Sequence, residues 1–282
     1  MTSEMLTLKD DFSLAHFAPA TDGFQPPTGE LDPGGAWEAT FELWETTQRA
    51  YKVGALSLVR TPMDDERFRL EMRLRKLATL GSQYCIAGMT CAMDALGTPL
   101  DWELETVLCD DKGQPIADTR LRETGLAVPG GLRVRVGDRE RTVSVQGPMA
   151  FWFGLFEAVQ RRSGPDAPAL EFTLIDRLNQ QVKPGQRLAF RRSATIELGG
   201  KRVWRETATE LEAGTVYRPV EVREGAVATK VNAWEQTGFG VLPTVYWVDD
   251  AGRLLMVLSG IAAYVYKSPG QRVVAPWEGD LV

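Results

Sequence analysis

Arg67-Phe68-Arg69-Leu70-Glu71-Met72-Arg73-Leu74-Arg75 is the stretch that decides the fold class of this chain. Apolar residues occupy every second position, and each position between them carries a charge. Successive side chains of a β-strand point to opposite faces. In a helix, side chains fall on the same face about every 3.6 residues. The pattern therefore predicts a strand with one buried and one solvated face.

The same alternation, bounded by turn residues, returns along most of the chain. Gly199-Gly200 and Asp249–Gly252 are typical of hairpin turns, which join antiparallel neighbours. Besides Arg67–Arg75, strands are predicted at Trp37–Leu43, Tyr51–Val59, Gln83–Met93, Trp102–Leu108, Leu132–Val136, Arg141–Gln146, Leu170–Asp176, Gln186–Leu198, Lys201–Glu210, Thr215–Val222, Val227–Glu235, Val241–Asp249 and Arg253–Tyr266.

One segment, Pro148–Arg162, breaks this rhythm and predicts a helix over residues 148–162. Proline suits a first helical turn, and the Arg161-Arg162 pair suits the C-terminal end. The segment is apolar nearly all round, so we expect it to be deeply packed. The predicted fold is mainly β: a large curved antiparallel sheet wrapped around one apolar helix, in the form of a half-barrel or, as the alternative, a closed barrel.

The chain of 282 residues predicts a single β domain. Residues 1–35 are rich in turn signals and predict an irregular lead-in. Residues 36–268 form the antiparallel β domain with its central helix, and residues 269–282 are expected to be a tail. One domain of this size is ordinary for large sheets and barrels.

Charge and composition restrict the classes of partner. Hydrophobic residues make up 44% and charged residues 25%, and the formal net charge is −6. Nucleic-acid binding needs a basic face, so we expect no nucleic-acid partner. No apolar stretch is long enough to cross a membrane. The oligomeric state is left open. Met1–Asp10 lacks the features of a signal peptide, so the chain as written is cytoplasmic, or periplasmic if a signal has been removed.

The three cysteines, Cys85, Cys91 and Cys109, have no spacing typical of a zinc site. Cys85 and Cys91 share a predicted strand, where they are too far apart to form a disulfide. We interpret all three as small core residues.

Three short stretches resemble a known group of proteins. They are Tyr51–Leu58, Val182-Lys183-Pro184-Gly185-Gln186 and Tyr246–Leu255. Together with the strand layout, they are similar to the curved half-barrel of the LolA/LolB lipoprotein carriers and of a related uncharacterised family of bacterial periplasmic half-barrels. The resemblance spans about residues 37–266. It implies an apolar ligand and supplies no catalytic residues.

Missing chemistry limits the activities that the chain can have. The sole histidine, His16, lies in the predicted lead-in, so Ser-His-Asp and Cys-His catalysis are disfavoured. Multi-histidine metal centres are excluded. No phosphate-binding loop or dinucleotide fingerprint is present. We predict no cofactor and no metal.

Six aromatic residues are candidates for lining a pocket, where flat rings cover lipids or stack on sugars. Core packing is the alternative role for each of them. The candidates are Trp102, Phe151, Trp152, Phe156, Trp204 and Trp247.

Glu103 and Glu105 are the catalytic candidates. They lie two apart on a predicted strand and therefore on one face. The plainer interpretation is cross-strand ion pairing on a solvated face. Alternatively, a close carboxylate pair serves as acid and base, as in glycosidases.

Three functional hypotheses follow. The first is a binding protein that holds a small apolar or amphipathic ligand between the curved sheet and the helix around Phe151–Val159. The second is a carbohydrate-active lyase or hydrolase that uses Glu, Tyr and Arg in a concave groove. The third is a structural or interaction module without a small ligand. Whether the chain is an enzyme is left undecided.

Overall fold

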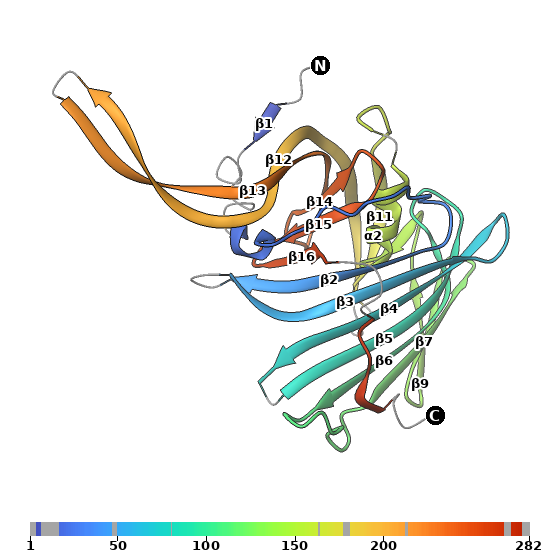
Figure 1. Ribbon diagram of the computed structural model, residues 1–282. Coiled ribbons are helices and arrows are strands. Elements are labelled where there is room, and N and C mark those ends of the chain that lie inside the picture. Colours follow the sequence, from blue (N-terminus) through green and yellow to red (C-terminus); the bar gives the residue numbers. More distant parts are fainter. Residues whose placement is uncertain are drawn as a thin grey trace.

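The computed structural model describes residues 4–6, 17–46, 50–79, 81–162, 164–176, 181–211, 214–267 and 272–277. Most of these residues belong to one sheet of 16 strands (Figure 1). The strands are β1 (Glu4–Leu6), β2 (Trp37–Thr46), β3 (Ala50–Pro62), β4 (Arg67–Ala78), β5 (Gly81–Ala92), β6 (Pro99–Cys109), β7 (Leu121–Val128), β8 (Gly131–Val136), β9 (Arg139–Ser144), β10 (Met149–Phe151), β11 (Leu170–Asp176), β12 (Gln181–Leu211), β13 (Gly214–Thr237), β14 (Thr244–Asp249), β15 (Leu254–Ser259) and β16 (Ala262–Tyr266).

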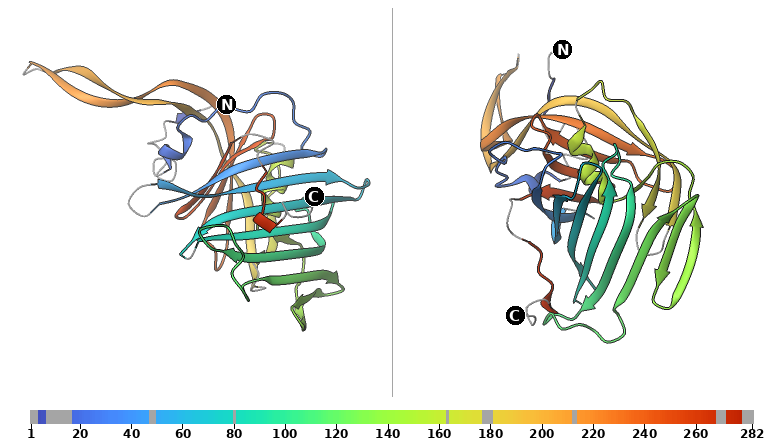
Figure 2. Two further views of the ribbon diagram at one scale, coloured as in Figure 1. Left: turned by 60° about the horizontal axis from the view of Figure 1, so that its bottom comes forward. Right: turned by 90° about the vertical axis from the view of Figure 1, so that its right-hand side faces the viewer.

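The sheet order is β10-β11-β12-β13-β14-β15-β16-β2-β3-β4-β5-β6-β7-β8-β9, with β1 attached to β12. In the described chain no pairing joins β9 to β10, so the sheet curves without closing. Two short pairings, β1 with β12 and β10 with β11, are parallel, and the others are antiparallel. The predicted curved β architecture is confirmed, in its open, half-barrel form (Figure 2).

The alternation in Arg67–Arg75 is reproduced by the burial of β4. Phe68, Leu70 and Met72 are fully buried, while the charged residues between them are exposed or half-buried. The apolar face of β4 therefore looks into the concave side of the sheet, where the main core lies. The other face lies in solvent, as period two requires.

The predicted helix over residues 148–162 is wrong in length. Met149–Phe151 forms strand β10, which pairs in parallel with β11, and the helix α2 covers only Gly154–Ala158. A 3₁₀ turn, η2 (Val159–Arg161), continues it. A continuous apolar run is found both in buried helices and in buried strands, so the sequence pattern could not distinguish a helix from a strand here. The predicted deep burial is confirmed, because all five residues of α2 are buried.

Both ends of the described chain pack against the sheet. A short 3₁₀ helix, η1 (Ala18–Thr21), lies in the lead-in, and the neighbouring Phe17 and Phe24 are buried in the main core. Near the C-terminus, Ala275 and Trp277 pack on Tyr84, on the face of β5 that looks away from the main core. These segments cover parts of the sheet that would otherwise expose apolar residues.

The prediction of a hairpin turn at Gly199-Gly200 is wrong. β12 continues through both glycines to Leu211. The whole of β13 pairs with it, from Gly214 to Thr237, as Figure 1 shows. Gly199 and Gly200 have positive φ angles of 74° and 76°, and Gly225, opposite them on β13, has 76°. Glycine adopts such angles without steric cost, so the paired strands bend here without ending.

Candidate ligand-binding cavity

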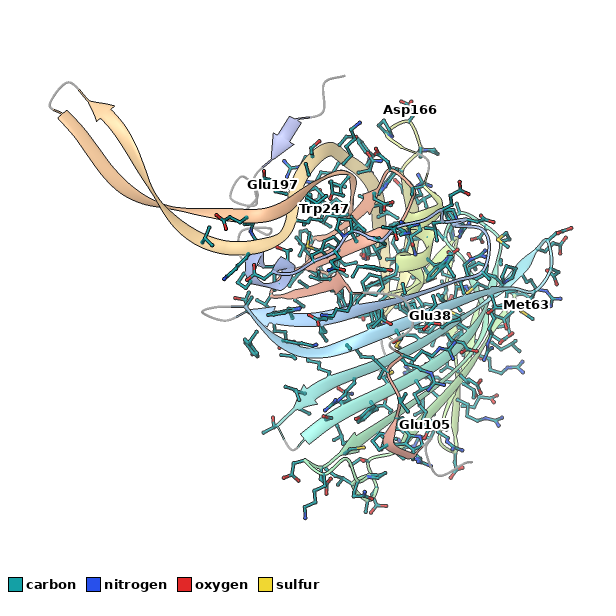
Figure 3. The ribbon with its side chains drawn as sticks, in the orientation of Figure 1. Glu38, Met63, Glu105, Asp166, Glu197 and Trp247 are labelled. Carbon is teal, nitrogen blue, oxygen red and sulfur yellow. The ribbon has the colours of Figure 1, made fainter. Side chains whose placement is uncertain are left out.

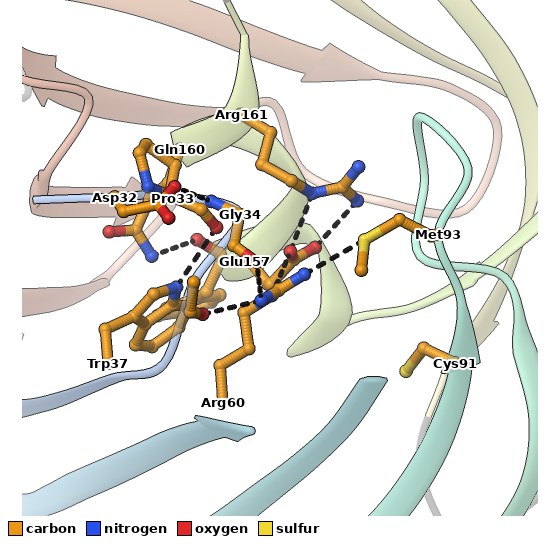
Figure 4. Close-up of polar contacts among 12 residues, drawn as sticks. Asp32, Pro33, Gly34, Trp37, Arg60, Cys91, Met93, Glu157, Gln160 and Arg161 are labelled. Carbon is orange, nitrogen blue, oxygen red and sulfur yellow. Dashed lines mark hydrogen bonds and ion pairs between the residues drawn. The ribbon is translucent and has the colours of Figure 1, made fainter. Parts of the chain in front are cut away.

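The short helix α2 is fixed by a buried ion-pair network, shown in Figure 4. Glu157, on α2, accepts hydrogen bonds from Arg60 Nε on β3 at 2.9 Å and from Arg161 Nε at 2.6 Å. The side chains of Arg60 and Glu157 are completely buried. The Arg60 guanidinium also lies 4.3 Å from the centre of the Phe68 ring. A buried charge needs such partners, so the network sets the position of α2 against the sheet.

Arg60 also holds the lead-in to the core. Its Nη1 donates to the carbonyl oxygens of Gly34 and Gly35, the latter at 2.6 Å. The indole Nε1 of Trp37 donates to Pro33 O at 3.4 Å. The residues before β2 are therefore bound to the same cluster that fixes α2.

A cavity of about 450 Å³ lies between the lead-in and the rim of the sheet. Its lining comes from the 25–32 segment, from Ala36–Ala39 at the start of β2, from Gln160 on η2, and from Arg253-Leu254 and Tyr266-Lys267. Leu31, Trp37 and Leu254 supply apolar surface. The other lining residues include positively and negatively charged side chains. The cavity is thus amphipathic.

Arg253 connects the two walls of this cavity. Its Nη1 donates to Pro27 O at 3.1 Å and its Nη2 donates to Gly29 O. Its own backbone N–H donates to Asp249 Oδ1 at 2.7 Å. Burial raises the pKa of the Tyr266 hydroxyl. The nearby charge of Arg253 offsets part of this rise, and the charge of Asp249 adds to it. The Tyr266 hydroxyl therefore stays protonated and can donate a hydrogen bond within the cavity.

Glu38 and Lys267 contribute opposite charges to the lining. Glu38 Oε1 is buried without a hydrogen-bond partner among the described residues, and Arg272 Nε lies 3.7 Å from it. Lys267 Nζ lies 3.1 Å from Glu42. Glu38 (labelled in Figure 3) is thus ion-paired with Arg272 near the C-terminus, and Lys267 is ion-paired with Glu42.

Four of the predicted pocket aromatics pack around α2. The Trp102 ring meets Phe151 edge to face at 5.0 Å between centroids, and the Phe156 ring meets Phe41 at 5.8 Å. Trp152 is half-buried, with its centroid 5.9 Å from that of Phe156. These rings contact one another and the sheet, and contact with a ligand stays a prediction for all four.

The other two aromatics lie on different strands. Trp247 (Figure 3) is fully buried on β14 with the Arg192 guanidinium 5.6 Å from its ring centre, and its Nε1 has no hydrogen-bond partner among the described residues. Trp204 belongs to β12, but its side chain is not among those described. His16 also lies outside the described residues.

Glu103 and Glu105 lie on the face of β6 that looks away from the core. Arg69 Nη2 donates to Glu103 Oε1 at 2.9 Å, and Glu105 is paired with Arg120 at 3.0 Å and Arg122 at 3.2 Å. Glu103 is 71% exposed in its side chain. Both carboxylates are thus in cross-strand ion pairs, and an acid–base role for them stays a prediction.

The described residues include no cluster of three or more His, Cys, Asp or Glu side chains that could hold a metal ion. Among the helices described, none is long and apolar enough to span a membrane.

Comparisons with known proteins found similarity in structure only. No family model and no curated protein matches the chain. A β-barrel-like protein of the domain of unknown function DUF1849 from Brucella abortus is similar with a TM-score of 0.47 and 12% identity, over 83% of this chain and 95% of that one. A DUF1089 family protein from Pseudomonas aeruginosa has a TM-score of 0.35 and 12% identity, over 89% and 100%. The resemblance to LolA/LolB carriers stays a prediction.

Sequence reasoning did not find the residues that build the cavity. The 25–32 segment has only turn signals, and a turn-rich stretch does not indicate what it covers. Two isolated charges were usable signals: Glu157 within an apolar segment, and Arg253 directly before the apolar run Leu254–Leu258. A charge inside an apolar run must find a partner in the core, because burying it alone is too costly.

Proposed function

We propose that the chain is a binding protein for a small amphipathic ligand held in the cavity beneath the lead-in. The observation that carries this proposal is the mixed lining, in which the apolar Leu31, Trp37 and Leu254 lie beside the polar Gln160, Arg253 and Tyr266. Ligand sites are concave, largely apolar and furnished with few polar groups that fix orientation. The volume of about 450 Å³ falls in the range of small-molecule sites, roughly 300–1,000 Å³.

The polar groups favour a ligand whose polar end carries a hydrogen-bond donor. Three carboxylate residues belong to the lining, Glu30, Asp32 and Glu38, and their oxygens can accept from that end. The apolar body then lies against Leu31, Trp37 and Leu254.

In this proposal Phe156, one of the predicted aromatic residues, supports the wall of the cavity. Phe156 packs edge to face on Phe41 at 5.8 Å, and Phe41 packs on Tyr266 at 6.0 Å between centroids. We infer that α2 positions Tyr266 through these rings. The proposed site thus meets this segment at Gln160, the residue directly after the predicted Phe151–Val159 pocket, and no residue of 151–159 is in its lining. The half-barrel resemblance, which implies an apolar ligand, supports the same class of ligand.

Titration with N-phenyl-1-naphthylamine, a fluorescent apolar probe with one N–H donor, tests the proposal. We expect saturable binding with one site per chain. Ala39→Leu, which adds volume to the lining, should weaken binding by about tenfold, equivalent to 1.4 kcal/mol. Phe239→Ser is the matched control, because Phe239 is 87% exposed and lies outside the lining.

Equal affinity in the wild type and in Ala39→Leu would overturn the proposed site. Loss of binding in Phe239→Ser would show that the probe reads an exposed apolar surface, and would also overturn it. Circular dichroism confirms that each variant is folded. Mass spectrometry of an organic extract of the purified protein then identifies the natural ligand.

A further inference from the structure

Beyond Gly200 and Gly225, β12 and β13 leave the body of the sheet as a two-stranded arm, described at residues 201–211 and 214–224 (Figures 1 and 2). Its direction is fixed at the base. Arg223 donates to Gly199 O at 2.9 Å and to Ala18 O at 2.6 Å, and lies 3.0 Å from Asp22. The arm is therefore anchored to η1 and is not a loose extension.

The arm has no described strand on either outer edge. β11 pairs with β12 only as far as Leu188 and β1 only as far as Ile196, while β14 pairs with β13 from Val231 onward. A two-stranded hairpin is only marginally stable in water, and an unpaired edge presents free N–H and C=O groups. The arm thus calls for a further strand.

The two edges of the arm differ, because Pro219 lies on β13. Proline has no N–H and is tolerated in a paired strand only where its nitrogen faces away from the neighbour. The free edge of β13 therefore lacks a donor in the middle of the arm. Glu206 is the register partner of Pro219. The outward backbone groups of β12 thus belong to the even-numbered residues from 202 to 210, and this edge carries no proline.

The charges along the β12 edge divide by sign. Lys201, Arg202 and Arg205 lie towards the body, and Glu206 and Glu210 lie towards the tip. Antiparallel pairing of two copies of this edge about a two-fold axis sets the basic half of one copy opposite the acidic half of the other. Such an isologous contact closes as a dimer.

We propose that the chain forms a homodimer by pairing the β12 edge of one arm with the β12 edge of a second copy. With the axis at Trp204, position 204 faces itself, and Arg202 faces Glu206 on both sides of the axis. This register sets no like charges directly opposite each other. Axes at Arg205 or Glu206 would instead set identical charges face to face, which is destabilising.

Single-cysteine variants test the register. Directly opposed residues of an antiparallel pair are about 5.5 Å apart at Cα, within the range of a disulfide. We expect Trp204→Cys to form a covalent dimer under mild oxidation and Thr207→Cys, the matched control on the same arm, to stay uncrosslinked. The three native cysteines are buried and do not compete. Crosslinking of Thr207→Cys in place of Trp204→Cys would overturn the register.

Charge reversal tests the dimer itself, with sedimentation velocity as the readout and circular dichroism as the check on folding. Arg202→Glu should weaken the dimer by at least about tenfold, and the double variant Arg202→Glu/Glu206→Arg should restore it. Wild-type chain that sediments as a monomer at about 100 μM, well above the dissociation constant of a stable dimer, would overturn the proposal. So would a double variant that stays as weak as the single one.

Discussion

Replacing Arg60 by methionine removes the centre of the network that joins the sheet, the helix α2 and the lead-in. Methionine keeps most of the buried volume and removes the charge. Among the described residues Glu157 then retains Arg161 alone as a counter-ion, and the carbonyl oxygens of Gly34 and Gly35 lose the hydrogen bonds from Arg60. We expect the variant to fold, but with a much smaller free energy of unfolding.

The magnitude follows from burial. The Arg60 and Glu157 side chains are both 0% exposed, at 2.9 Å between Nε and Oε1. Removing one partner of a buried ion pair costs about 3–5 kcal/mol, because the other charge stays buried without full compensation. A domain has only about 5–15 kcal/mol of stability in total. Arg60→Met should therefore shift the urea midpoint strongly while leaving the protein folded in buffer.

A double-mutant cycle with Glu157→Met separates the pair from its surroundings. We expect each single variant to lose about 3–5 kcal/mol. The double variant should lose less than the sum of the two, because neither charge is then left alone, with a coupling of about 2 kcal/mol. Urea unfolding followed by tryptophan fluorescence measures all four states. Additive losses, or a loss below about 1 kcal/mol for Arg60→Met, would refute the reasoning.

Three further predictions concern other parts of the molecule. Burial alone would raise the pKa of Glu42, but hydrogen bonds from Lys52 and Lys267 outweigh the effect of burial and lower this pKa below its ordinary value of 4.5. Its stabilisation is therefore fully present above pH 4.5 and is lost as the pH falls through the lowered pKa. Glu42→Gln should cost about 1 kcal/mol at neutral pH, and the cost should shrink as the pH falls below 4.5, as measured by urea unfolding at a series of pH values. Burial raises the pKa of the Cys91 thiol, with a smaller contribution from the Glu157 charge; Ellman's reagent should therefore leave this thiol unmodified in the native protein and react with it only in denaturant, and rapid native labelling would contradict this. A β-carbon added at Gly125 would lie 1.9 Å from the Trp102 ring, so Gly125→Ala should lower stability by about 1–3 kcal/mol, seen as a drop in melting temperature.

The sheet could be predicted from the sequence because its signal is local. In β4 one face contacts the core and the other contacts water, so the residue pattern of Arg67–Arg75 records the environment of each position directly. The burial of the three cysteines was also predicted: Cys85, Cys91 and Cys109 are buried and form no disulfide. Where both faces of a strand are buried, the sequence is apolar throughout and does not show where the strand ends. Arg253–Tyr266 was predicted as one strand, but it turns at Gly260 between β15 and β16.

The cavity could not be predicted, because it depends on contacts between distant parts of the chain. Arg253 donates to Pro27 O across 226 positions of sequence, and Arg60 reaches the Gly35 carbonyl across 25. Neither pairing leaves a periodic trace. What the sequence does contain is the charge itself, set in an apolar run. Such a residue predicts that a partner exists without saying which one.

The same physical logic joins the length of the helix to the position of the site. An apolar segment that formed a helix over all of residues 148–162 would have filled the concave side by itself. Here Met149–Phe151 forms an edge strand instead, so the helix ends at Ala158, and Gln160 on the turn η2 that follows it lines the cavity at the rim of the sheet. A short helix leaves the rim to be covered by another segment. The lead-in does so through backbone carbonyls that bind Arg60 and Arg253, and a cover held by hydrogen bonds around its margin leaves space beneath it. The cavity is therefore a consequence of the strand that replaces the first turns of the predicted helix.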